Sequence, residues 1–120
     1  LLLFVMFSFN SFAEWTKAGK NTNGDTFYFD FERIRKVDGY VYYWELTDLA
    51  KPIQKYLSVK IYKQVDCKLF RFKWLSLSYH KLSMGKGFGD EDKPIEKHQS
   101  WKYPQPNSIG EIVTQSVCNQ

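Results

Sequence analysis

Two histidines are the residues of this chain best suited to proton transfer, and each would need a nucleophile and an orienting group beside it. His80 lies within Ser78-Tyr79-His80-Lys81, and His98 lies within Lys97-His98-Gln99. A Ser, Cys or Thr nucleophile is activated by a base that a third group holds in place, and neither stretch contains that set. We therefore expect both imidazoles to be exposed at the surface, and the sequence predicts a protein that is not an enzyme.

Two further stretches resemble ligand sites only superficially. Asp90-Glu91-Asp92 lacks the regular ligand spacing and the terminal bidentate Glu of a calcium loop. Residues 84–89, Met-Gly-Lys-Gly-Phe-Gly, lack the Gly-Lys-Ser/Thr ending of a phosphate-binding loop and lead into acidic residues. The sequence predicts no metal site and no cofactor.

The first thirteen residues favour export. Residues 1–9 are apolar and uncharged, and Ser11 and Ala13 place small residues at the positions that a signal peptidase reads. We expect cleavage between Ala13 and Glu14, which leaves a mature domain of residues 14–120. A positively charged start and an initiator Met are missing, so we expect the printed sequence to begin inside the signal peptide. A buried strand is the alternative for this segment. Because no cysteine lies near the cleavage position, a lipid anchor is not expected.

The two cysteines, Cys67 and Cys118, predict a disulfide. An even pair in an exported chain meets an oxidising compartment, and a small domain gains stability from a covalent link. A metal site is the weaker alternative, because neither histidine lies at ligand spacing to a cysteine.

Basic residues give the chain a formal net charge of +4, which favours anionic partners through long-range attraction. They gather around two neighbouring segments, and the sequence predicts an anionic-ligand patch there: Lys60, Lys63, Lys68, Arg71 and Lys73. In an exported protein the partner would be a protein, an anionic glycan or a lipid rather than nucleic acid. An ordinary solvated strand face, with lysines that protect an edge, is the alternative.

Alternation of apolar and polar residues predicts strands over most of the chain, with hairpin turns at Asn23-Gly24 and Asp38-Gly39. The expected strands cover residues 14–18, 26–31, 40–49, 56–62, 69–82 and 95–103. The apolar phase reverses near Trp74, which predicts a bulge or bend. Residues 84–94 are rich in glycine and acids and read as a mobile surface loop.

The end of the chain predicts a helix. Ser108 and Glu111 have capping-box spacing, and Ile109, Ile112, Val113 and Val117 form an apolar stripe. Cys118 would point away from this stripe, so we expect the last turn to fray. Together these elements predict an α+β fold, an antiparallel β-sheet of about five to six strands with one C-terminal α-helix and one disulfide.

The order of several short motifs resembles the surface-adhesin protein E-like domain family of bacteria. The shared stretches are residues 27–30, 41–48, 56–60, 65–67, 84–87 and 106–108, with Ile34, Arg71, Trp101 and Cys118. The resemblance covers residues 14–120 and implies an antiparallel sheet with a C-terminal helix, tied by a Cys67–Cys118 bridge. The family's namesake is a lipoprotein adhesin that binds host matrix and serum proteins and can dimerise. No binding residue of it can be matched to a position here.

These observations favour an exported, non-enzymatic binding module of the bacterial envelope, located in the periplasm, in the medium or at the cell surface. It would adhere to a host or matrix protein or to an anionic polymer, and a homodimer is one expected partner. The alternative is a structural or stress-related periplasmic envelope protein. Protease accessibility on intact cells separates the two.

Overall fold

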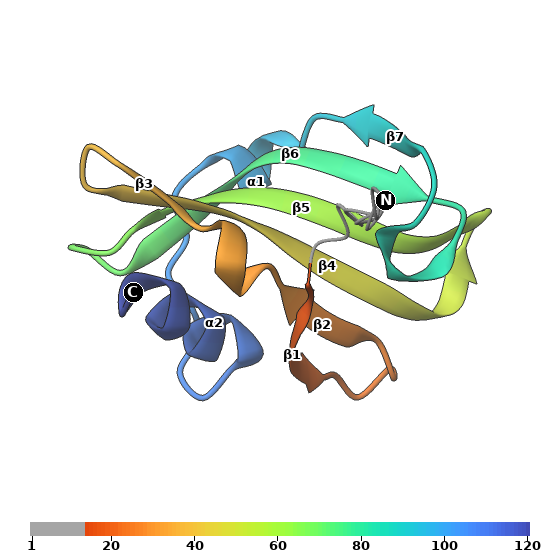
Figure 1. The fold of residues 1–120 in the computed structure, drawn as a ribbon, viewed down its shortest axis with the longest axis horizontal. Helices are drawn as coiled ribbons and strands as arrows, with labels where there is room; N and C mark the ends of the chain where they lie inside the picture. Colours follow the sequence, from red (N-terminus) through yellow and green to blue (C-terminus); the bar gives the residue numbers. More distant parts are fainter. Residues whose placement is uncertain (1–13) are drawn as a thin grey trace, which may run out of the picture.

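The computed structural model describes residues 14–120, and the predicted signal peptide with its cleavage after Ala13 lies outside the described residues. The chain forms one antiparallel sheet with strand order β1-β2-β4-β5-β6-β7, and β3 pairs with β4 beside β2 (Figure 1). The strands are β1 (Thr16–Lys20), β2 (Thr26–Phe29), β3 (Arg35–Val37), β4 (Tyr40–Ile53), β5 (Tyr56–Asp66), β6 (Arg71–His80) and β7 (Gly89–Asp92). The helices are α1 (Glu96–Gln99) and α2 (Ile109–Cys118), with 3-10 turns η1 (Phe31–Arg33) and η2 (Ser83–Gly85). The predicted fold class is confirmed, with seven strands in the sheet.

The two predicted hairpins form, but only one has the predicted turn. Asp38 and Gly39 both have positive φ, 51° and 84°, as a two-residue type I′ turn between β3 and β4 requires. The β1–β2 connection is longer than the predicted Asn23-Gly24 turn. The side-chain oxygen of Asn21 accepts the backbone N–H groups of Asn23 and Asp25, at 3.0 and 2.9 Å, and so organises a wider loop.

The predicted bulge near Trp74 is confirmed. On β5, consecutive residues Tyr62 and Lys63 face Ser76 and Trp74 of β6, so Leu75 is the extra residue. Because of this bulge, Phe72 and Trp74 before it and Leu77 after it lie on the same side of the sheet. The bulge thus unites two apolar segments that have opposite phases in the sequence.

Two predictions for the segment between β6 and α2 are wrong. The stretch predicted as a mobile loop, residues 84–94, contains part of η2 and all of β7, and β7 pairs with residues 77–80 of β6. Gly89 has no side chain, which lets β7 approach His80 closely. The predicted strand over residues 95–103 is instead the single helical turn α1, and only Lys102 forms a bridge, to Phe72.

The C-terminal helix begins at its predicted cap. The Ser108 hydroxyl accepts the Glu111 N–H at 3.1 Å, while the Glu111 carboxylate accepts the N–H of Asn107 rather than that of Ser108. The Ser108 N–H already donates to the carbonyl of Gln105, which explains the difference. The helix continues through Cys118, so the expected fraying of its last turn is wrong.

Helix α2 packs on one side of the sheet, which we call the helix face. Its buried residues are Val113, Thr114 and Val117, whereas Ile112 is 51% exposed and does not belong to the packed stripe as predicted. The core that it closes joins Val113 and Val117 to four sheet residues: Phe29, Val41, Tyr43 and Val65. The Cys67–Cys118 disulfide, predicted from the sequence, links the end of β5 to the end of this helix across a separation of 51 residues.

A short segment, residues 83–86, crosses the opposite side of the sheet. We call this segment the strap and this side of the sheet the open face. The N–H of Met84 donates to Asp48 and the N–H of Gly85 donates to the Ser58 hydroxyl, each at 2.8 Å. The strap covers Leu46, which is fully buried. Among residues 14–120, no helix is long and apolar enough to cross a membrane.

Removal of the disulfide should release α2 before the sheet. A helix of this length is marginal alone in water, so the free energy of unfolding should fall by about 2–5 kcal/mol in a Cys67→Ser/Cys118→Ser variant. Thermal melting of both proteins with and without reductant checks this. The parent should lose stability on reduction, and the variant should not respond. Identical melting of the oxidised and reduced parent would show that the bridge does not hold the fold.

Candidate functional site

Of the two histidines that the sequence predicts at the surface, His80 is buried and His98 is only partly exposed. His80 is 2% exposed, its Nε2 lies 2.8 Å from the Ser78 hydroxyl, and its Nδ1 lies 3.2 Å from the carbonyl of Lys86. A backbone carbonyl oxygen can only accept a hydrogen bond, so Nδ1 of His80 carries the proton and Nε2 accepts from the Ser78 hydroxyl. The alternation of β6 brings the two side chains to one face, because they lie two residues apart.

This Ser–His pair is closed to an external substrate. A Cβ placed on Gly89 would collide with the Ser78 hydroxyl and the His80 ring, so the backbone of β7 lies directly against the pair. Burial, and then the positive charge of Lys60, lower the pKa of His80 and favour its neutral form. The pair therefore serves to join β6 to the strap and to β7 in this structure.

The other chemistry-bearing groups do not converge. His98 stacks on Trp74 at 4.1 Å and its Nδ1 contacts the ammonium of Lys102, and burial followed by Lys102 lowers the pKa of His98. Asp90 and Asp92 alternate with Glu91 along β7, so the three carboxylates do not surround one point. In the described part of the chain no three potential ligands come together to hold a metal ion.

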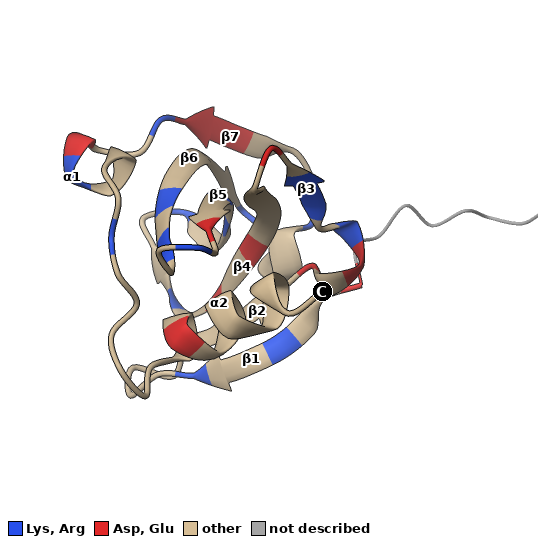
Figure 2. Cartoon of the chain, turned by 90° about the vertical axis from the view of Figure 1, so that its left-hand side faces the viewer, with Lys and Arg blue, Asp and Glu red and all other residues tan. Residues whose placement is uncertain are grey.

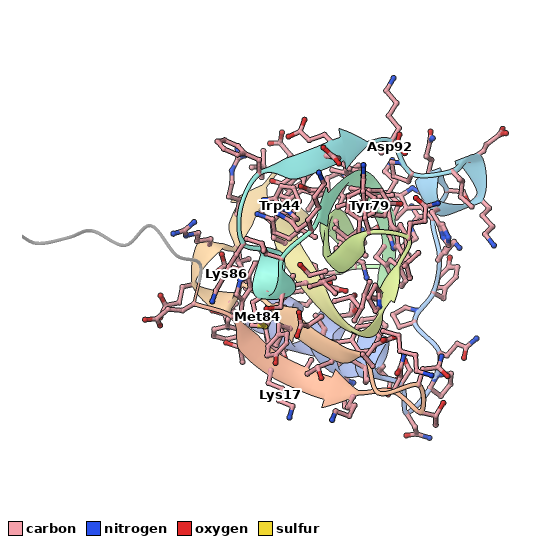
Figure 3. All side chains as sticks on the ribbon, turned by 90° about the vertical axis from the view of Figure 1, so that its right-hand side faces the viewer. Lys17, Trp44, Tyr79, Met84, Lys86 and Asp92 are labelled. Atoms are coloured by element: carbon pink, nitrogen blue, oxygen red, sulfur yellow. A yellow bond between two sulfur atoms is a disulfide. The ribbon has the colours of Figure 1, made fainter. Side chains whose placement is uncertain are left out.

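The acidic edge strand lines a shallow cleft. Asp90, Glu91 and Asp92 border a space of about 380 Å³ together with the rings of Tyr56 and Tyr79. The Tyr56 hydroxyl donates to Asp90 at 2.5 Å. Figure 3 shows Asp92 and Tyr79 at this end of the sheet, and Figure 2 shows β7 as an acidic strand.

The predicted basic patch is divided between the two sides of the sheet. Lys63 is 8% exposed and lies on the helix face, because it pairs in register with Tyr43 and Trp74. Its ammonium forms an ion pair with Glu45 at 2.9 Å and lies 4.6 Å from the centre of the Phe72 ring. Lys63 is therefore a structural residue rather than part of a surface patch.

The Lys63–Glu45 pair belongs to a small buried network on the helix face. The Tyr43 hydroxyl donates to the Glu45 carboxylate, so one carboxylate serves both partners. Burial, and then the neighbouring charge of Glu45, raise the pKa of Tyr43 well above its ordinary value. This network crosses the helix face at the edge of the core.

Three of the remaining patch residues share the open face, while Lys68 lies exposed in the β5–β6 turn. Register places Lys60 opposite Ser78, and Arg71 and Lys73 opposite Asp66 and Gln64. Aromatic side chains lie on the same face between these cations. We call this surface the aromatic–basic face. It consists of Arg35, Tyr40, Tyr42, Trp44, Lys60, Tyr62, Arg71, Lys73 and Trp101.

The rings of the aromatic–basic face form two contacting groups. Trp44 and Tyr62 lie 4.8 Å apart and Tyr62 and Tyr42 lie 6.3 Å apart, measured between ring centres. Tyr40, the next residue on this side of β4, stacks on Trp101 at 6.0 Å. All five rings are partly exposed, so the row is held in place by neighbours while it still meets solvent.

Cations lie directly against these rings. The ammonium of Lys60 lies 5.9 Å from the Trp44 ring, and Arg71 and Lys73 lie 4.6 and 4.7 Å from the Trp101 ring. Contacts of this kind are favourable because the ring face carries negative potential. The side chains of Lys60, Arg71 and Lys73 therefore have less conformational freedom than they would on a strand without neighbouring rings.

Most of the positive charge on this face has no carboxylate partner. Arg71 forms an ion pair with Asp66 at 3.0 Å. Burial alone would raise the pKa of the Asp66 carboxyl, but hydrogen bonds from the Leu69 amide and the Arg71 guanidinium lower it overall. Among the described residues no ion pair joins a carboxylate to Arg35, Lys60 or Lys73. Figure 2 shows bands of Lys and Arg on β5, β6 and β3.

Sequence analysis predicted Lys60, Arg71 and Lys73 for this face, but neither Arg35 nor the aromatic row. The aromatic residues of β4 occur on both sides of the strand, so their register could not be assigned without the pairing partners. Trp101 lies in a predicted strand, but the structure brings it to the face on the short segment after α1. Figure 3 shows Trp44 beside the strap that carries Met84 and Lys86.

Comparison with known proteins identifies the type of domain. The family model for surface-adhesin protein E matches residues 15–119. Protein E of Haemophilus influenzae has a similar structure, with a TM-score of 0.70 at 18% identity over 88% of this chain and 83% of that chain. Protein E from non-typeable Haemophilus influenzae gives a TM-score of 0.68 at 17% identity, over 92% of this chain and 79% of that one. No curated protein matches the sequence. At these identities the structural likeness shows the fold.

The two sides of the sheet should respond differently to loss of a lysine. Lys63→Met leaves the Glu45 carboxylate, whose side chain is only 13% exposed, without its ion-pair partner, so the free energy of unfolding should fall by about 3–5 kcal/mol. Lys73→Met removes a partly exposed contact with Trp101 and should cost less than about 1 kcal/mol. Denaturant unfolding of both variants measures this. Equal losses would contradict the assignment of the two lysines to different environments.

Stability should decrease on mild acidification because of His80. Its pKa is lowered in the folded protein, so the unfolded state binds a proton first as the pH falls below the ordinary value of about 6.5. The stabilisation is therefore complete above that pH and is lost below it. A His80→Gln variant should be less stable at neutral pH but should show a flatter dependence between about pH 7.5 and 5.5.

The matched comparison is His98→Gln, because His98 also has a lowered pKa but is more exposed. It should flatten the profile less than His80→Gln. Urea unfolding at several pH values measures all three proteins. An unchanged slope in the His80→Gln variant would show that His80 does not couple folding to protons.

Proposed function

The chain belongs to the surface-adhesin protein E family, and we propose that it acts as an exported binding module without enzymatic activity. In this proposal the aromatic–basic face contacts a macromolecular partner, a host or matrix protein or an anionic polymer. Family membership supports a surface role. The division of the sheet into a helix face and an open face supports the choice of surface.

One observation carries the proposal, namely that partly exposed aromatic rings and unpaired cations occupy the same uncovered part of the sheet. Tyr, Trp and Arg are enriched among the residues that dominate binding energy at protein interfaces. Here Trp44 and Tyr62 provide broad apolar contact area, and Lys60 and Lys73 provide charge without a carboxylate partner. An ordinary solvated strand face would carry the charged side chains for solubility, but that role does not require partly exposed aromatic rings.

The second support is that the face is already organised before a partner binds. The rings contact one another, and Arg71 and Lys73 are held against Trp101. Side chains that are ordered in advance lose less conformational freedom on binding, which improves affinity for the same contact area. The cations would also accelerate encounter with an anionic partner, an effect that weakens as salt increases.

A pair of matched variants tests this proposal. The face variant combines Trp44→Leu, Lys60→Gln and Lys73→Gln. The control variant makes the same kinds of change at exposed positions outside the face, Phe88→Leu, Lys81→Gln and Lys93→Gln. Beads that carry each purified domain are applied to a cell-derived extracellular matrix, and the retained fraction is counted.

The face variant should be retained about tenfold less than the parent, because loss of one central aromatic contact typically costs more than 1 kcal/mol of binding. The control variant should behave like the parent. Circular dichroism of each protein verifies that the domain is folded. Equal retention of the two variants would place the contact elsewhere on the molecule and contradict the proposal.

A further inference from the structure

We propose that the ligand of the aromatic–basic face is a linear acidic polysaccharide, whose sugar rings pack on the aromatic row while its acidic groups meet the flanking cations. This inference rests on the proposed function and names the class of partner for the same surface. It follows from the order of rings and charges along the strands.

The rings form a row rather than an isolated patch. Tyr40, Tyr42 and Trp44 point to the same side of β4 at alternate positions, which spaces them by about 6.6–7 Å along the strand. Tyr62 bridges Tyr42 and Trp44 from the neighbouring strand. A row of this kind can contact consecutive units of an extended polymer, whereas a compact ligand would use only part of it.

The chemistry of the row fits sugars. A pyranose ring has one face of C–H groups, which packs against an aromatic face by dispersion and weak polar contact, and hydroxyl groups at its rim. The tyrosine hydroxyl groups and the Gln64 amide offer hydrogen bonds beside the rings, and Gln64 already donates to the Tyr42 hydroxyl at 3.0 Å. Apolar area with polar groups at its border is the arrangement that such a ligand requires.

Cations lie on both sides of the row. Arg35 pairs in register with Tyr42 on one side, and Lys60 and Lys73 lie on the other side along β5 and β6. None of the three has an ion pair with a carboxylate of the described residues. A polymer with a carboxylate or sulfate on its sugars would place acidic groups at both borders of the row.

Lys60 is the most constrained of these cations. Its stem packs under the strap, where a Cβ on Gly85 would lie 3.2 Å from the Lys60 Cδ, and its ammonium lies over Trp44. Burial lowers the pKa of Lys60, which is the cost of a partly desolvated charge without a counter-ion. An acidic group bound beside Trp44 would supply that counter-ion.

The test compares four probes on the intact, disulfide-bonded domain by biolayer interferometry. A heparin oligosaccharide and a hyaluronan oligosaccharide are acidic sugars that differ in carrying sulfate or only carboxylate. Poly-L-glutamate of matched charge has no sugar rings, and single-stranded oligothymidylate combines charge with bases. At least one acidic oligosaccharide should bind at least about tenfold tighter than either of the other two probes. Poly-L-glutamate can engage only the cations, and oligothymidylate would place flat bases rather than sugar rings on the aromatic row.

Two variants separate the contributions. Trp44→Leu/Tyr62→Leu removes the rings while it keeps apolar side chains at both positions, and it should weaken oligosaccharide binding about tenfold without changing the salt dependence. Lys60→Gln/Lys73→Gln should weaken binding and also reduce its salt dependence, because exposed charges are screened by salt. The control variant at Lys81, Phe88 and Lys93 should bind like the parent. The comparison of probes on the parent domain remains decisive if the ring variant fails to fold.

Several outcomes would overturn the inference. Poly-L-glutamate that binds as tightly as the sugars would mean recognition by charge alone, and oligothymidylate that binds tighter would indicate a nucleic-acid site. Unchanged binding by the folded ring variant would exclude stacking. If neither oligosaccharide binds, but retention on the matrix still depends on the face and survives heparinase and hyaluronidase treatment of that matrix, the proposed function stands and this inference fails.

Discussion

The covalent attachment of α2 to one side of the sheet is the constraint on which the rest of the structure depends. The helix is short, and its buried contribution comes mainly from Val113 and Val117. The Cys67–Cys118 bridge joins it to the end of β5, so it can close the core over Phe29, Val41, Tyr43 and Val65. Because the helix occupies that side, the part of the opposite side of β4, β5 and β6 that the strap leaves uncovered remains available for contact with another molecule.

The bulge at Leu75 keeps the other apolar residues of β6 on the helix face and its basic residues on the open face along the whole strand. Without the extra residue, Phe72 and Leu77 would lie on opposite sides of the sheet. With it, both lie on the helix face, while Arg71, Lys73 and Ser76 lie on the open face. A single local irregularity therefore separates the apolar and basic residues of the strand. The same register places Lys63 on the helix face, where Glu45 compensates its charge.

The sequence was sufficient for the fold class, the disulfide, the type I′ turn at Asp38-Gly39 and the bulge, because each depends on local spacing or on composition. It was insufficient where tertiary contacts determine burial or secondary structure. His80 has polar neighbours in the chain, yet β7 and the strap bury it. Residues 95–103 contain aromatic residues typical of strands, but only Lys102 meets a partner strand. The surface patch was predicted from charge alone, and alternation removed Lys63 from it and added the aromatic row.

The central claim is that the helix closes one side of the sheet and leaves the other side as the contact surface. Titration of the isotope-labelled domain with a heparin oligosaccharide, followed by backbone and side-chain NMR shifts, tests it most directly. The account predicts that the largest changes occur at Tyr42, Trp44, Lys60, Tyr62 and Lys73, and that α2 remains unchanged. Changes centred on α2 or on the acidic strand β7, with the aromatic–basic face unaffected, would contradict it.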